Sequence, residues 1–72
     1  MPINKQVKLG LRGIDGNAFA IMGAFQRQAK REQWTDEEIK TVLDEAKGTH
    51  SYDGLLCVIA DHCVNPLSRY KG

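Results

Sequence analysis

The feature that most constrains this chain is the alternation of apolar and polar side chains in residues 5–12, which is typical of a strand with one buried face. The apolar positions are Val7, Leu9 and Leu11, and the polar positions are Gln6, Lys8 and Arg12. No hairpin partner follows in the sequence, so the backbone N–H and C=O groups of this strand need a partner from elsewhere. The C-terminal tail and a second copy of the chain are both open as that partner.

Length and composition predict one small domain over residues 1–72. A chain of this size buries only about 60% of its unfolded surface, so pairing with another copy would add useful stability. The hydrophobic fraction of 42% and the charged fraction of 26% are typical of a globular protein. The longest apolar run, 55–60, is far shorter than the roughly 20 residues that span a bilayer, and no signal-peptide pattern is present. We therefore expect a cytoplasmic protein with no membrane partner.

The first of three helical patterns predicts a helix over 17–33, which Asn17 or Asp15 can cap by accepting from free N–H groups of its first turn. Gly23 in its middle costs about 1 kcal/mol relative to alanine, and we expect it to let another backbone approach closely. The apolar side chains recur at three- and four-residue spacing, which predicts one buried face made of Ala18, Ile21, Met22, Phe25 and Ala29.

The second helix is predicted over 35–47, because its start carries two capping signals. Thr35 and Glu38 have the spacing of a capping box, and Trp34 and Ile39 flank the cap as a hydrophobic staple. These signals depend only on neighbouring residues, so they fix the start of the helix without reference to the rest of the fold.

The third helix is predicted over 52–64, ending before Pro66. It is almost entirely apolar, so we expect it to be the most buried element, although the β-branched pair Val58 and Ile59 also allows a strand. Residues 65–72 are predicted to form a loose tail. The predicted fold class is therefore α+β and mainly α, with one N-terminal strand followed by a three-helix core.

Catalytic and metal-binding patterns are weak in this sequence. On one helix, Cys57 and Cys63 would lie about 9 Å apart along the axis, beyond the roughly 7 Å limit for a disulfide, which predicts reduced thiols packed as small apolar side chains. The other candidate groups are His50, Asp53, Asp61 and His62. Together they lack the spacing of a Cys–His catalytic pair or of a zinc site. We expect no enzyme activity, no metal and no cofactor.

The glycines between the strand and the first helix also favour a structural role. Residues 10–16 lie where backbone N–H groups could hold a phosphate, but they lack the motif of a nucleotide-binding loop. Gly13-Ile14-Asp15-Gly16 matches the GXXG of KH domains, yet that loop joins two helices. A turn is the favoured interpretation.

Charge is distributed unevenly along the chain. Residues 1–31 contain six basic side chains and one acidic one, a net charge of +5, whereas residues 32–64 contain eight acids and two lysines, a net charge of −6. The two halves can compensate each other, either within one fold or across a dimer, and this mutual compensation is the favoured interpretation; the basic half could instead meet an acidic partner. The candidate interaction residues are Lys8, Leu9, Leu11, Arg12, Arg27, Lys30 and Arg31.

Several motifs resemble those of short, uncharacterised proteins of bacteria and their phages. These motifs are Gly13-Ile14-Asp15-Gly16-Asn17-Ala18-Phe19, Met22-Gly23-Ala24, Trp34-Thr35 before an acidic helix start, and Tyr52-Asp53 before Leu55-Leu56. The resemblance covers about residues 7–63 and implies a bacterial or phage origin. It implies no catalytic or binding residue, because no activity is established for that group.

One strand followed by two helices also resembles the ribbon-helix-helix repressors, in which strands from two chains pair in the DNA major groove. That resemblance implies that Gln6, Lys8 and Arg12 face the groove. Three acids at the start of the second helix would repel phosphate at that helix N-terminus. We therefore expect a small protein–protein interaction module, self-associating through its N-terminal strand or modulating a host protein for a phage, and nucleic-acid binding is the alternative.

Overall fold

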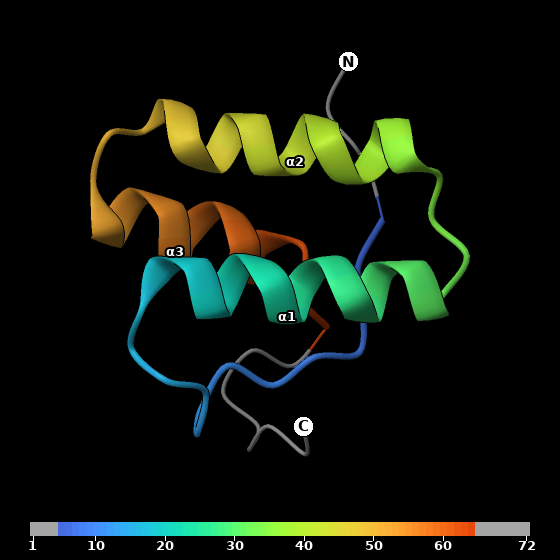
Figure 1. Cartoon of the computed structure of the whole chain (residues 1–72), viewed down its shortest axis with the longest axis horizontal. Coiled ribbons are helices and arrows are strands. Elements are labelled where there is room, and N and C mark those ends of the chain that lie inside the picture. The colour runs from blue at the N-terminus through green and yellow to red at the C-terminus, as the bar shows by residue number, and fades with distance from the viewer. Residues whose placement is uncertain (1–4, 65–72) are drawn as a thin grey trace.

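The computed structural model describes residues 5–64, which form three helices: α1 (Ala18–Arg31), α2 (Asp36–Gly48) and α3 (Tyr52–Asp61). Figure 1 shows α1 and α2 running in opposite directions, with α3 between them in this view. The prediction of a mainly helical chain with three helices is confirmed. No helix in residues 5–64 is long and apolar enough to cross a membrane. The loose tail predicted at 65–72 lies outside the described residues.

Local capping determines both ends of α1. Asn17, rather than the alternative Asp15, caps the start, because its side chain accepts a hydrogen bond of 2.8 Å from the N–H of Phe19. At the other end, the N–H of Trp34 donates to the carbonyl of Ala29 at 3.0 Å. This bond belongs to a Schellman motif, in which Gln33 adopts a φ of 68° at the position that glycine usually fills.

The capping box of α2 is present as predicted. The N–H of Glu38 donates to the Thr35 hydroxyl at 3.1 Å, and the Glu38 carboxylate accepts from the N–H of Thr35 at 2.9 Å. Trp34 and Ile39, the two members of the predicted staple, are both buried in the core. The first turn of α2 is therefore held by its own sequence.

α3 begins near its predicted start but ends at Asp61, earlier than the predicted residue 64. The chain leaves the helix because its next backbone groups bind Val7: the N–H of Val7 donates to the carbonyl of His62 at 2.8 Å, and the N–H of Val64 donates to the carbonyl of Val7 at 2.9 Å. The helix is also less buried than predicted. Cys57 is exposed, so the prediction that both cysteines pack in a buried helix is wrong for this residue.

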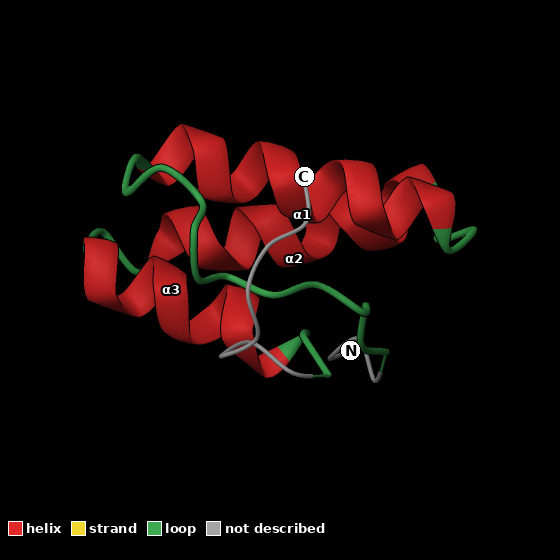
Figure 2. Cartoon of the chain, turned by 90° about the horizontal axis from the view of Figure 1, so that it is seen from below, coloured by secondary structure: helices red, strands yellow, loops and turns green. Residues whose placement is uncertain are grey.

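The N-terminal strand predicted over 5–12 does not form among the described residues. The segment makes a single parallel bridge between Val7 and Cys63, and Figure 2 draws it as a loop that runs along the helices. The ladder does not continue, because its next bond would run from the N–H of Leu9 to the carbonyl of Val64, and these two groups are not hydrogen-bonded. The N–H of Lys8 faces the opposite edge and donates to the Glu32 carboxylate at 2.7 Å. The strand that made the predicted fold class α+β is therefore missing from residues 5–64.

The core joins all three helices to this extended segment. Val7 and Leu9 are buried, so the predicted apolar face of the segment does point inward. Phe25 packs edge-to-face on Trp34, with ring centroids 5.5 Å apart. The buried apolar side chains are Val7, Leu9, Ile21, Ala24, Phe25, Ala29, Trp34, Ile39, Val42, Ala46, Leu55, Ile59 and Cys63.

Candidate functional site

The predicted interaction residues of the N-terminal segment are split between the core and the surface. Leu9 is only 4% exposed and Leu11 packs against the core, so these side chains serve the interior. Lys8 and Arg12 are exposed. The alternation was therefore informative about burial, but its apolar members do not form an accessible patch in this conformation.

The backbone of this segment finds partners within the chain. Both backbone groups of Val7 bind the residues that follow α3, and the N–H of Lys8 binds Glu32. The Gln6 side chain adds a hydrogen bond of 3.3 Å to the carbonyl of Asp61. Of the two partners left open for this segment, Val7 therefore pairs with residues of its own chain.

Charged and aromatic groups anchor the start of the segment. The Lys5 ammonium lies 2.7 Å from the Glu38 carboxylate and 5.9 Å from the centroid of the Trp34 ring. Nδ1 of His62 lies 3.1 Å from the carbonyl of Lys5, which requires that this nitrogen carry the proton. The hydrogen bond from Lys5, followed by the one from the Thr35 backbone, lowers the pKa of Glu38 from its ordinary value. These groups tie the segment to α2 and to the residues after α3.

The predicted basic residues of α1 lie on its outer surface. Arg27, Lys30 and Arg31 are all exposed, and no acid occurs on this helix. Among residues 5–64 the only ion pair joins Lys5 to Glu38, so these three cations have no carboxylate partner within that part of the chain. Mutual compensation of the two halves, within the fold or across a dimer, stays a prediction, and residues 5–64 contain one ion pair between the halves.

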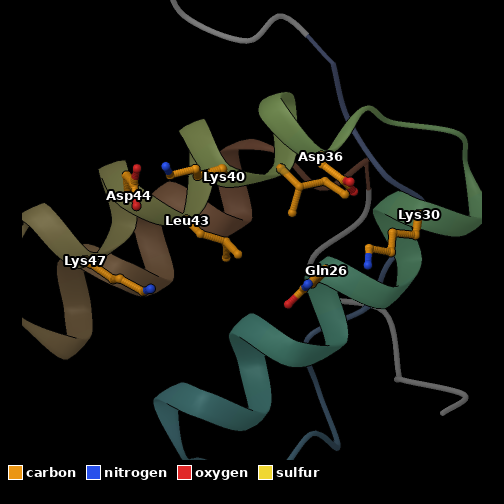
Figure 3. Close-up of a pocket in the computed structure, with 8 residues that line it drawn as sticks. Gln26, Lys30, Asp36, Lys40, Leu43, Asp44 and Lys47 are labelled. Atoms are coloured by element: carbon orange, nitrogen blue, oxygen red, sulfur yellow. The ribbon is translucent and has the colours of Figure 1, made fainter.

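Of these cations, Lys30 borders a groove of about 410 Å³ between α1 and α2. Figure 3 shows Lys30 and Asp36 at one end and Lys47 at the other, with Gln26 and Leu43 between them. Ile39 is buried at its base and Leu43 is half-buried, so the groove has an apolar centre and a charged rim. The lining residues are Gln26, Lys30, Asp36, Ile39, Lys40, Leu43, Asp44 and Lys47.

Of the predicted interaction residues, only Lys30 lines this groove, so most of the groove was not predicted from the sequence. The missed signal is the outer stripe of α1: Phe19, Gln26 and Lys30 fall within about 40° of one another around a helix of 3.6 residues per turn. Phe19 is 79% exposed, the most exposed large apolar side chain of the described residues. Its place outside the predicted buried face could have marked this stripe.

The candidate catalytic residues do not share one environment. The Cys63 thiol donates to the carbonyl of Ile59 at 3.1 Å, and burial, with a smaller effect from Glu32, raises its pKa to about 12. Cys63 is therefore a neutral thiol at physiological pH, which is the unreactive form. Cys57 is exposed on α3, and His62 stacks edge-on against Trp34 at 6.3 Å. Within residues 5–64, no three His, Cys, Asp or Glu side chains gather as metal ligands would.

Comparisons of the chain with protein-family models, with curated proteins and with solved structures found no match.

Proposed function

We propose that this chain works by binding another protein, and that its binding surface is the groove between α1 and α2 together with Phe19. The observation that supports this most directly is the apolar centre of the groove, at Leu43, framed by the charged side chains of its rim. Protein interfaces combine these features, because an apolar centre supplies most of the binding energy and a polar rim supplies specificity. Phe19 adds an exposed aromatic side chain of the kind enriched in interfaces.

The N-terminal segment supports association less well than the helices do. Its apolar side chains Val7 and Leu9 are used in the core, and the backbone of Val7 is already hydrogen-bonded within the chain. A ribbon-helix-helix dimer would need those same backbone groups for pairing with a second strand. Nucleic-acid binding through Gln6, Lys8 and Arg12 is therefore the weaker proposal.

Affinity capture from a bacterial lysate, with identification by mass spectrometry, tests this proposal when it compares three forms of the chain. Lys40→Glu reverses a charge on the groove, and Glu45→Lys makes a reversal of equal size on the same helix but outside the groove. We expect proteins that are retained by the unmodified chain and by Glu45→Lys but lost with Lys40→Glu. An identical set of proteins for all three forms would contradict a groove-based function.

An electrophoretic shift assay on DNA and RNA separates the alternative. If the alternative holds, binding weakens steeply with salt and is lost in Lys8→Glu, because phosphate contacts release counterions. If the groove is the site, Lys8→Glu leaves protein capture unchanged.

A further inference from the structure

We infer that a second copy of this chain is the partner that occupies the α1–α2 groove, docked so that α1 of each copy lies against α2 of the other. The inference rests on the proposed function, since it names the partner of the same surface. Such a contact is isologous: a two-fold axis running along the groove makes the contact twice. The result would be an antiparallel four-helix arrangement built from two helices of each copy.

The charges of the two helices are equal and opposite. α1 carries three basic residues and no acid, a net charge of +3, whereas α2 carries five acids and two lysines, a net charge of −3. On the groove itself α2 carries two acids and two lysines, so the complementarity there is local: docking α1 on the partner's α2 brings Lys30 against Asp36 in both halves of a two-fold contact. Docking α1 on the partner's α1 would oppose two sets of cations, so the charges also select the orientation.

The side chains that would pair are available for a partner. Lys30 and Asp36 lie at the same end of the groove in Figure 3, yet they form no ion pair with each other. In the proposed dimer Lys30 meets the partner's Asp36 and Asp36 meets the partner's Lys30. Each exposed contact is weak, but symmetry supplies it twice.

The two helices also match in register. Because α1 and α2 are antiparallel and rise equally per residue, positions equally far from their connection lie at the same level. A two-fold axis along the groove keeps that level between the copies. To within one residue, or about 1.5 Å of rise, the positions at the same level are Lys30 with Asp36, Gln26 with Lys40, Gly23 with Leu43, and Phe19 with Lys47.

The shape of the surface agrees with this register at Gly23. A β-carbon placed there would meet no atom within 4 Å, so nothing packed against it requires this helix-interior glycine. In the dimer the half-buried Leu43 of each copy would project into the open space at the other copy's Gly23. Phe19 would lie against the ammonium and methylene groups of the partner's Lys47.

The available area is sufficient for a specific dimer. The molecule measures 30 × 27 × 16 Å, and the face that contains α1 and α2 is the broad one seen in Figure 1. A standard interface buries roughly 800 Å² on each partner, which a face of this breadth can supply.

Sedimentation equilibrium over a range of protein concentrations tests the inference. The unmodified chain should approach twice its mass of 8.0 kDa as concentration rises, and added salt should weaken the association. Lys30→Glu and Asp36→Lys should each raise the dissociation constant by about tenfold or more, because each reversal makes two contacts repulsive. An equimolar mixture of these two variants should regain the dimer, since both contacts of the mixed pair are again between opposite charges.

Lys8→Glu is the matched control, because it reverses a lysine on the N-terminal segment. It should leave dimerisation unchanged, and loss of the dimer in this variant would instead indicate pairing through the segment. A monomer at every concentration, or a mixture of Lys30→Glu and Asp36→Lys that stays monomeric, would overturn the inference. If such a monomer still captures proteins through the groove, the proposed function survives with a different partner.

Discussion

Replacing Gly23 with alanine should raise the free energy of unfolding by about 1 kcal/mol, because alanine is the better helix former by that amount. The gain should be realised in full, since the added methyl group meets no atom within 4 Å in this chain. Gly23 lies inside α1 and its φ is not in the left-handed region, so alanine fits without backbone strain. Helix propensity alone therefore determines that the free energy of unfolding rises in Gly23→Ala.

Gly54 in α3 provides the matched comparison. A β-carbon there would lie 2.5 Å from Cβ of Thr49 and 2.8 Å from the Ser51 hydroxyl, which accepts from the N–H of Gly54 to cap the helix. Alanine must therefore displace Thr49 or the cap. Overpacking costs about 1–3 kcal/mol and a lost cap about 1 kcal/mol, which exceeds the gain of about 1 kcal/mol in helix propensity. Gly54→Ala should therefore lower stability, although it is the same glycine-to-alanine exchange as Gly23→Ala.

Urea denaturation followed by circular dichroism measures both changes, at protein concentrations low enough that dimerisation adds nothing. In thermal unfolding of a domain of this size, a change of 1 kcal/mol corresponds to a shift of about 4–8 °C in the midpoint, so the two variants should separate clearly. At high concentration the gain from Gly23→Ala should shrink, because its methyl group occupies the space proposed for the partner's Leu43. The reasoning is refuted if Gly23→Ala is no more stable than the unmodified chain at low concentration, or if Gly54→Ala is more stable than the unmodified chain.

Three further outcomes follow from local geometry. Gln33→Gly should raise the thermal midpoint by relieving about 1 kcal/mol of left-handed strain at a φ of 68°; an unchanged midpoint would contradict this. Glu38→Gln keeps the capping box but loses the ion pair with Lys5. Because folding lowers the pKa of Glu38 from its ordinary value, its stabilising effect is fully present above the pKa of the unfolded chain and is lost as the pH falls through the folded pKa. Urea midpoints of the two forms should therefore differ at neutral pH and converge in acid. A thiol reagent should modify Cys57 in the folded protein, whereas Cys63, with its pKa raised to about 12, should react only after unfolding.

Features that depend on neighbouring residues could be predicted from the sequence. The capping box of Thr35 and Glu38 needs only a hydroxyl and a carboxylate three positions apart, and it forms as predicted. The burial of Val7 and Leu9 also followed from local alternation. Each of these signals is complete within a few residues, so tertiary packing had little opportunity to override it.

Features that depend on distant partners could not be predicted in the same way. An alternating segment becomes a strand only if a second segment supplies a ladder, and here the described residues after α3 pair with the segment at Val7 alone. The same contact moved the end of α3 to Asp61, ahead of the proline that was predicted to stop it. One long-range bridge therefore accounts for two local errors.

The groove illustrates a related limit. Charge indicated the basic residues of α1, but a groove exists only because α2 packs antiparallel beside that helix. Lys40, Leu43 and Asp44 carry no signal of their own, since charged and half-buried side chains are ordinary on a surface helix. Their spacing becomes informative once it is read against the matching spacing on α1.

The extended segment and the groove together determine what kind of association this chain can make. Residues 5–8 already use backbone groups within the chain, so a partner that added a strand there would have to displace Val7 from its bridge. The groove is lined only by side chains of α1 and α2, and its use requires no such displacement. Association through the groove should therefore respond to salt and to side-chain charge. Association through the segment would instead require the core position of Val7 to be given up, with a loss of stability that the monomer would show on its own.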